Sequence, residues 1–174
     1  NKRIAVSPIA SVAGGHNRDV LVKVAAALDK AAVEVGVDLF GGFSALVQKS
    51  STPTARALID SLPEALSTTQ RVCSSLNVAS TRAGINMDAI SHTGQIIRTM
   101  ASTDAENHGF ACAKLVVFAN IPEDNPFMAG ASHGQGEADA VVNIGVSGPG
   151  VVKRALQRLI EQVGADNLTL ADLA

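Results

Sequence analysis

Short apolar segments alternate with helical patterns along this chain, and this alternation constrains the fold more than any other feature. Five segments are rich in β-branched residues and apolar at odd and even positions alike, as expected for strands: 3–9, 37–46, 71–78, 113–120 and 140–147. Strands that are apolar on both faces are typical of parallel sheets, because helices cover both sides of such sheets. The segments therefore predict a buried, mainly parallel sheet.

Helical periodicity fills the intervals between these segments. Apolar residues recur every three to four positions in 17–36, 52–70, 86–103 and 148–164. Gly36 suits the position after a helix end, Pro63 predicts a break or kink, and Pro149 suits a first helical turn. This order predicts an α/β protein, a single domain over 1–174 with a five-stranded, mainly parallel sheet and flanking helices.

Composition restricts the possible partners. Of the 174 residues, 47% are hydrophobic and 17% are charged, which suits one domain with a substantial core. The net charge is −2 and neither Trp nor Tyr occurs, so no nucleic-acid surface is expected. No apolar run reaches the roughly 18 residues of a membrane span. The two cysteines fit a reduced, cytoplasmic protein.

The two ends of the chain suggest a fragment. The chain starts with "NKRIAVSP", without an initiating Met and almost directly on the first strand. It stops at "TLADLA", within a new helical pattern. We therefore expect a piece of a longer protein, truncated at both ends.

Unusual polar residues follow the predicted strands. The carboxyl ends of parallel strands lie on one rim of the sheet, where ligands bind in α/β proteins. Helix starts at that rim favour an anion, because their first backbone N–H groups are unpaired. We therefore expect a small anionic metabolite at the rim, bound by these residues: His16, Ser74, Asn77, Asn86, Ser147, Gly148 and Gly150.

The segment "SGPG" (147–150) illustrates both the prediction and its alternative. It joins the last predicted strand to a helix, and its glycines let a ligand approach the backbone. The alternative is a tight turn in which Ser147 only caps the helix. The spacings of the Walker and Rossmann motifs are both absent.

A long polar connection, "EDNPFMAGASHGQGEAD" (123–139), precedes the fifth predicted strand. Ordinary connections need about 4–6 residues, and longer ones are usually functional or disordered. Its carboxylates are hard oxygen ligands that suit a divalent cation such as Mg²⁺ or Ca²⁺: Glu123, Asp124, Glu137 and Asp139. His133 is a candidate acid–base catalyst. The alternative is a solvated loop whose acids make turns and caps.

We expect this connection to be ordered. Phe127 and Met128 have no reason to occur in a merely solvated loop, so they should be buried as its anchor. The tip, with His133, should then lie near Ser147 and Cys73 at the rim.

Cys73 is the second candidate catalytic residue. It lies in the predicted strand 71–78, in "VCSSLN", where polar groups occupy both faces of a buried strand. The alternative is a small buried hydrophobe, the usual role of a lone cysteine in a strand. Nothing adjacent in the sequence predicts an activated thiolate.

Several long segments closely resemble a known family of proteins. The segments are "GVDLFGGFSALVQK", "VCSSLNVASTRAGINMDA", "KLVVFANIPEDNPFMAGASHGQGEAD" and "VNIGVSGPGVVKRAL". They are similar to a bacterial and archaeal family usually labelled "PFL family protein", after pyruvate formate-lyase. The resemblance covers nearly the whole chain, and its members are more than twice as long.

The resemblance implies a fold like that of the glycyl-radical enzymes, a ten-stranded α/β barrel made of two five-stranded parallel halves. This chain would be one half-barrel, with the missing half-barrel segment of the same protein as its partner. The resemblance also implies a cytoplasmic homodimer. Cys73 is the residue here that matches the barrel cysteine of glycyl-radical enzymes, whose radical glycine would lie beyond Ala174.

Two classes of function remain open from the sequence. One is an enzyme that acts on a small anionic metabolite at the strand rim. The other is a non-catalytic metabolite-binding or regulatory protein that uses the same rim. A ligand beside Cys73 and a histidine would favour the enzyme, and a pocket of backbone donors alone would favour the binding protein.

Overall fold

The computed structural model describes residues 1–122, 125, 131–132, 140–145 and 148–164 of the chain. It divides into two compact units, Asn1–Val141 and Val142–Ala174, which are described separately below.

The first unit contains parallel β-sheet, as the alternating pattern predicts. Its strands are β1 (Arg3–Ala5), β2 (Leu39–Gly41), β3 (Ala45–Leu46), β4 (Ser74–Ser80), β5 (Gly84–Ile85) and β6 (Leu115–Ala119). β1 pairs with β2, β3 with β4 and β4 with β6, all in parallel. The exception is β5, which follows a tight turn and pairs antiparallel with the end of β4.

The strands form two sheets instead of the single sheet that we predict, and Gly42 lies where the predicted strand 37–46 divides. Gly42 has a φ of +100°, and a Cβ atom there would lie 2.2 Å from the carbonyl oxygen of Val6. Only glycine fits this position without strain. A single parallel bridge between Phe40 and Val72 connects the two-stranded sheet to the four-stranded one.

Helices follow the strands, with ends close to the predicted ones. They are α1 (Ile9–Val12), α2 (Arg18–Val35), α3 (Pro53–Thr68), α4 (Met87–Thr103), the 3₁₀-helix η1 (Ala105–Asn107) and α5 (Phe110–Ala113). Side chains of Asn17, Thr52 and Asn86 cap α2, α3 and α4 by accepting bonds from backbone N–H groups. Gly36 ends α2 in the left-handed conformation, as predicted.

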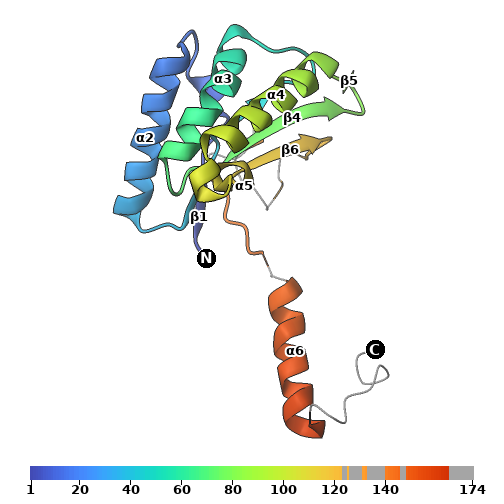
Figure 1. Ribbon diagram of the computed structural model, residues 1–174. Helices are drawn as coiled ribbons and strands as arrows, with labels where there is room; N and C mark the ends of the chain where they lie inside the picture. The colour runs from blue at the N-terminus through green and yellow to red at the C-terminus, as the bar shows by residue number, and fades with distance from the viewer. Residues whose placement is uncertain (123–124, 126–130, 133–139, 146–147, 165–174) are drawn as a thin grey trace. The chain divides into compact units, whose positions relative to one another are not determined.

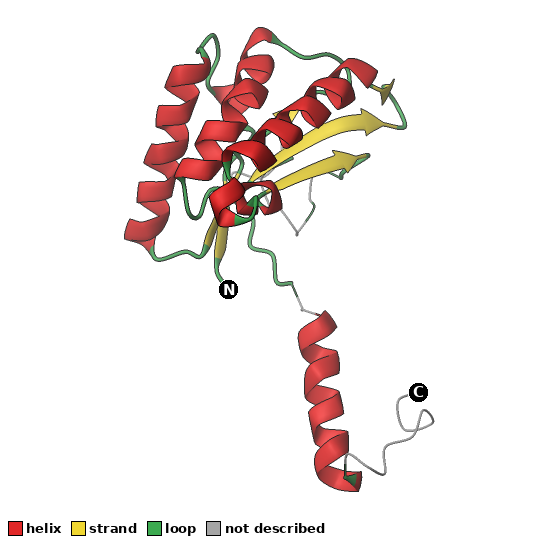
Figure 2. Cartoon of the chain, viewed as in Figure 1, coloured by secondary structure: helices red, strands yellow, loops and turns green. Residues whose placement is uncertain are grey.

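The three long helices form one layer on one face of the strands (Figures 1 and 2). α3 packs between α2 and α4. The buried core lies between this layer and the sheet, and its largest members include Leu21, Leu58, Leu62, Leu76 and Met100. The described residues therefore confirm an α/β fold with parallel strands and flanking helices, but they do not form a closed barrel.

Two further predictions are wrong. α3 continues through Pro63 as one helix, so the break that was predicted as an alternative to a kink does not occur. Residues 140–145 are not a strand, although the predicted strand covered 140–147, and residues 146–147 lie outside the described part of the chain. Val142 and Ile144 are about 90% exposed, at 91% and 90%.

The second unit contains α6 (Gly148–Val163), which begins and ends as the sequence predicts. None of its described residues is buried. Its apolar residues lie along one stripe that includes Val152, Leu156 and Ile160. α6 is therefore an amphipathic helix whose apolar side has no cover among the described residues. In the described part of the chain, no helix is long and apolar enough to cross a membrane.

Candidate functional site

The candidate site lies on the face of the sheet opposite the helices. In β4, Leu76 and Val78 belong to the core beneath the helices. Successive side chains in a strand point to opposite faces, so Ser75 and Asn77 point away from the helix layer. We call this side the helix-free face.

Four small polar residues form a row on the helix-free face. Ser75 and Asn77 come from β4, and Cys73 precedes them at the same spacing of two. β3 pairs with β4 through Ala45 and Leu76, which places Ser44 beside Ser75 one residue earlier. We call Ser44, Cys73, Ser75 and Asn77 the polar row.

Three residues of the polar row are buried and Cys73 is half-buried, although no helix of the first unit's described residues covers this face. Exposure is 0% for Ser44, 3% for Ser75 and 6% for Asn77. One cover is the connection after β6, because Ser44 donates a hydrogen bond of 3.0 Å from Oγ to the carbonyl oxygen of Ala131. Ala131 is itself fully buried. This part of the long connection is therefore anchored on the sheet.

Asn77 stabilises an irregularity in the sheet. The pairing of β4 with β6 shifts register between Asn77 and Ala79. With its amide nitrogen turned toward β6, Asn77 donates to the carbonyl oxygens of Phe118 and Ala79 at 3.2 and 3.0 Å. The amide thus pairs carbonyl groups at the irregularity, which is a structural role for a predicted ligand residue.

Cys73 lies at the amino end of β4, not in the middle of a strand as predicted. Its backbone N–H donates to the carbonyl oxygen of Phe40 in the neighbouring strand. Burial raises the pKa of the Cys73 thiol, and the positive charges of Lys114 and Arg3 only partly oppose this shift. Cys73 is therefore a neutral thiol at pH 7, not an activated thiolate.

Ser74 belongs to the core and not to the helix-free face. It shares its side of β4 with Leu76, and it is 0% exposed. Its hydroxyl oxygen has no hydrogen-bond partner among the described residues. The predicted ligand-binding role of Ser74 would require access that this position does not offer.

Two charged residues at the amino end of the sheet were not predicted from the sequence. Asp29 Oδ1 accepts hydrogen bonds of 3.0, 2.7 and 3.3 Å from the backbone N–H groups of Gln70, Arg71 and Val72. These hydrogen bonds hold α2 against residues 70–72, which lead into β4. Asp29 lies in an ordinary helical pattern, so the sequence carries no signal for this contact.

Lys114 is the second unpredicted residue. It is 7% exposed, and its ammonium group donates to the carbonyl oxygens of Leu66 and Thr69 at the end of α3. A cation at a helix carboxyl end is stabilised by the unpaired carbonyl groups there. Burial lowers the pKa of Lys114, while Cys73, Asp29 and Asp104 oppose the shift. The sequence feature that could have predicted this role is a single Lys directly before an apolar strand.

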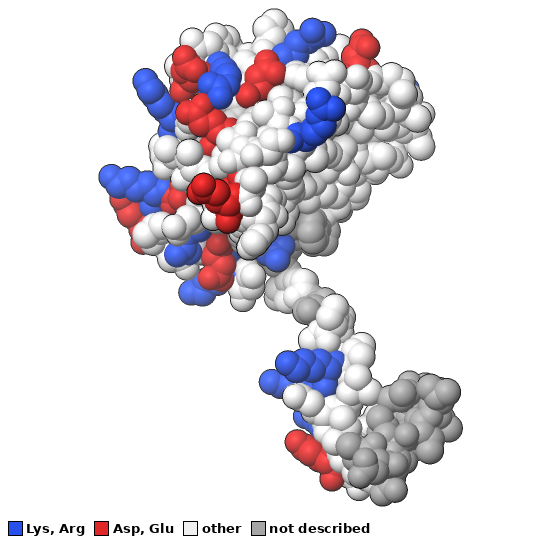
Figure 3. All heavy atoms as spheres, viewed as in Figure 1, with Lys and Arg blue, Asp and Glu red and all other residues white. Residues whose placement is uncertain are grey.

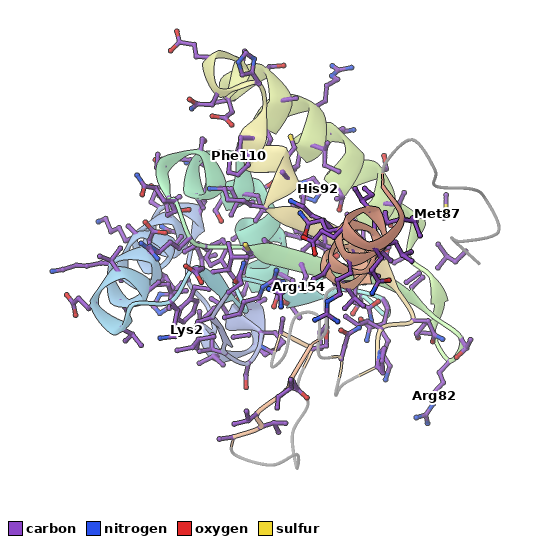
Figure 4. All side chains as sticks on the ribbon, turned by 90° about the horizontal axis from the view of Figure 1, so that it is seen from below. Lys2, Arg82, Met87, His92, Phe110 and Arg154 are labelled. Carbon is purple, nitrogen blue, oxygen red and sulfur yellow. The ribbon has the colours of Figure 1, made fainter. Side chains whose placement is uncertain are left out.

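Two other predicted ligand residues, Asn86 and His16, lie toward the carboxyl end of the sheet. Figure 4 shows Arg82 and Met87 at this end, and Lys2, which precedes β1, toward the other. Asn86 caps α4 through Oδ1, and its Nδ2 donates to the carbonyl oxygen of Val47 at 2.7 Å. Asn86 therefore joins β3 to α4, which is a structural role.

His16 is exposed in the turn before α2. The N–H of the preceding Gly15 donates to the hydroxyl of Thr54 at 3.0 Å, so this turn lies beside the first turn of α3. Cys73, near the amino end of β4, and His16, beside a helix start, belong to opposite ends of the strands. The structure does not bring them together.

The structure does not place the remaining predicted site residues relative to this site. Gly148 and Gly150 lie in the first turn of α6, in the second unit. The others lie outside the described residues: Glu123, Asp124, His133, Glu137, Asp139 and Ser147, as do Phe127 and Met128. Among the residues that are described, no cluster of His, Cys, Asp and Glu could hold a metal ion.

Comparison with known proteins identifies the family. The family model described as "Uncharacterised ACR (DUF711)" matches residues 1–172. The chain belongs to this family.

Relatives in the DUF711 family come from diverse bacteria. A UPF0210 protein of Acetivibrio thermocellus is 59% identical over 172 residues, which are 99% of this chain and 37% of that protein. A UPF0210 protein of Neisseria meningitidis is 57% identical over 174 residues, which are 100% of this chain and 37% of that protein. The chain therefore spans little more than a third of the length of these relatives.

Proposed function

We propose that this chain contributes a binding site for a small anionic metabolite, located on the helix-free face of the sheet. The observation that carries the proposal is the polar row, because four adjacent polar side chains on one sheet face are unusual inside a protein. Ser75 is 3% exposed and lies beside Ser44, whose hydroxyl bonds to the connection after β6.

Charge supports an anionic ligand. Arg3 in β1 and Lys114 both lie close enough to Cys73 to lower the pKa of its thiol. The first turns of α2, α3 and α4 lie at the carboxyl end of the strands, and helix starts carry partial positive charge. A small carboxylate or phosphate compound would therefore meet positive potential from both ends of the row.

The state of Cys73 favours binding over nucleophilic catalysis. A cysteine nucleophile needs a lowered pKa, and burial raises the pKa of Cys73. A neutral thiol is the form that donates a hydrogen atom, so glycyl-radical-type chemistry, implied by the resemblance to the PFL family, is the second candidate function. That function would need the rest of the longer protein.

The proposal also covers the architecture of the longer protein. Helices cover one face of the strands (Figure 1). The polar row lies on the other face, and this arrangement suits a barrel wall. We propose that the longer protein completes a barrel around the polar row and acts as a cytoplasmic homodimer. Light scattering of the full-length protein would report the dimer, and a monomer would remove this part of the proposal.

A ligand screen of the full-length protein tests the binding site. Small carboxylates and phosphate compounds should include one that raises the Tm, because a ligand that binds only the folded state stabilises it. Ser75→Ala should abolish that rise while it leaves the Tm without ligand nearly unchanged. Ser91→Ala, on the exposed surface of α4, is the matched control. A rise that survives in Ser75→Ala would place the ligand elsewhere.

A further inference from the structure

The hairpin that joins β4 to β5 is held at its tip by a residue of another strand. Ser80 pairs with Gly84 across the turn, and the backbone N–H of Ala83 donates to Ser80 Oγ at 3.0 Å. Asn120, which follows β6, accepts two more bonds through Oδ1, each of 3.1 Å, from the backbone N–H and the hydroxyl of Thr81. The turn is therefore fixed both from within and from the neighbouring strand.

The backbone of Asn120 is adapted to this contact. Its φ of +57° lies in the left-handed region, which Asn adopts more readily than most residues other than Gly. Its own N–H donates to the carbonyl oxygen of Ala79 at 2.7 Å, directly before the hairpin. A turn that only connects two strands needs no bond from a third strand. The contact therefore indicates that the position of the hairpin tip matters.

The hairpin tip carries Arg82. Arg82 is exposed, and Figure 4 shows it and Met87 on opposite sides of the end of β4. Met87 begins α4 in the helix layer, so Arg82 extends on the side of the helix-free face. Asn77, the last residue of the polar row, precedes Ser80 by three positions in the same strand, a separation of about 10 Å. Arg82 thus lies at the carboxyl end of the polar row.

The charge of Arg82 is not neutralised locally. Among the residues that the structure describes, none of the ion pairs includes Arg82 or Asp88, the acidic residue nearest to it in sequence. Lys49, which follows β3 at the same end, is exposed and is also in none of these pairs. In Figure 3, charged side chains gather over the helices, whereas few lie at the ends of β4 and β6. This end of the sheet can therefore attract an anion.

We propose that Arg82 binds the anionic group of the ligand through paired hydrogen bonds from its guanidinium, at the carboxyl end of the polar row. The planar guanidinium fits a carboxylate or a phosphate, and a tip that is already fixed loses little freedom on binding. The inference rests on the proposed binding site. It adds the residue that selects an anion, and it orients the ligand with the rest of its length along the polar row toward Ser75.

Modification of arginines by phenylglyoxal in the full-length protein tests the proposal. Peptide mapping reports the rate at each arginine separately. Inorganic phosphate or acetate should slow the modification of Arg82 with a saturating dependence on concentration, about tenfold at ten times the dissociation constant. Arg98, exposed on α4, should react at an unchanged rate. Sodium chloride at equal ionic strength controls for screening. Arg82 rates that respond to neither anion would overturn the proposal.

Variants of Arg82 test the paired bonds. The dependence of the Tm on phosphate concentration gives an apparent affinity for phosphate. Arg82→Gln should weaken this affinity at least about tenfold, because a hydrogen-bonded charge is lost. Arg82→Lys keeps the charge without the paired donors, and its affinity should fall between the two. Arg98→Gln is the matched control and should bind phosphate like the unmodified protein. Full affinity in Arg82→Gln would overturn the role of Arg82.

Ser75→Ala separates this inference from the proposed site on which it rests. Weaker phosphate binding in both Ser75→Ala and Arg82→Gln would support one ligand that reaches both residues. Weaker binding in Ser75→Ala alone would support the polar row and overturn the role of Arg82. Weaker binding in Arg82→Gln alone would keep Arg82 as an anion-binding residue and overturn the polar row as part of its site.

Discussion

The hydroxyl of Ser44 donates a hydrogen bond to the carbonyl oxygen of Ala131, 87 residues further along the chain. Both residues are fully buried. The bond joins the break between β2 and β3 to the connection that follows β6. It is the contact among the described residues that holds this connection against the polar row.

Replacement of Ser44 by Ala tests the energy of this contact. The variant would leave the carbonyl group of Ala131 buried without its partner, which costs about 1–3 kcal/mol. Urea unfolding should show a lower free energy of unfolding by that amount. Thr99→Ala, which removes an exposed hydroxyl bonded within α4, should cost under about 0.5 kcal/mol. Equal losses in the two variants would argue against an anchoring role for Ser44.

Gly42 provides a test of backbone geometry. Ala at this position would adopt a φ of +100° and place Cβ 2.2 Å from the carbonyl oxygen of Val6. We expect Gly42→Ala to lower the free energy of unfolding by at least about 2 kcal/mol. Gly14→Ala is the matched control, because a Cβ atom there meets nothing within 4 Å. A tolerated Gly42→Ala would show that the chain relaxes around the break between β2 and β3.

The reactivity of Cys73 should respond to Lys114. The Lys114 charge lowers the pKa of the Cys73 thiol against the larger effect of burial. Lys114→Gln removes the charge and keeps a donor near the end of α3. The pKa of Cys73 should then rise further, and alkylation at pH 8 should slow roughly threefold to tenfold. Peptide mapping after iodoacetamide treatment measures this rate.

The exposed Lys23 provides the control for this experiment, as Lys23→Gln. The alkylation rate of Cys73 in this variant should equal that of the unmodified protein. An unchanged rate in Lys114→Gln as well would mean that burial alone determines the state of the thiol.

Asp104 should make stability depend on pH. Hydrogen bonds from the backbone N–H of Ala111 and the side chain of Asn107 lower the pKa of Asp104 below its usual 3.8. The folded state therefore holds this proton less tightly than the unfolded state. The contribution to stability is complete at neutral pH and is lost as the pH falls through about 4 toward the lowered pKa.

Asp104→Asn removes the titrating group. The variant should be less stable at pH 7, and its free energy of unfolding should change less between pH 5 and pH 3 than that of the unmodified protein. Glu106→Gln, in the same turn but exposed, should keep the original pH dependence. Parallel pH profiles for Asp104→Asn and the unmodified protein would remove Asp104 as the cause.

Local signals predicted the helices well because each signal acts within a few residues. The Asn17 cap and the Gly36 end of α2 depend on neighbouring backbone groups alone. The segment 140–147 shows the limit of such signals. Its β-branched residues carry strand propensity, but a strand also needs a neighbour, and residues 140–145 have none among the described residues.

The candidate site was predicted only in part for a related reason. The segment "VCSSLN" predicted a strand with polar groups on both faces, and Ser74–Ser80 is a strand. The prediction began the strand at Arg71 and so placed Cys73 inside it, whereas β4 begins at Ser74. The sequence could not pair Ser44 with Ala131 or Asp29 with residues 70–72, since both contacts join segments that are far apart in the chain.

The carboxylate of Asp29 has a consequence for experiments with added anions. Three successive N–H groups, at residues 70–72, converge on Asp29 Oδ1. Such a backbone nest would otherwise attract phosphate or sulfate from solution. The carboxylate of Asp29 already occupies this nest. Sulfate from a crystallisation medium should therefore not bind at residues 70–72.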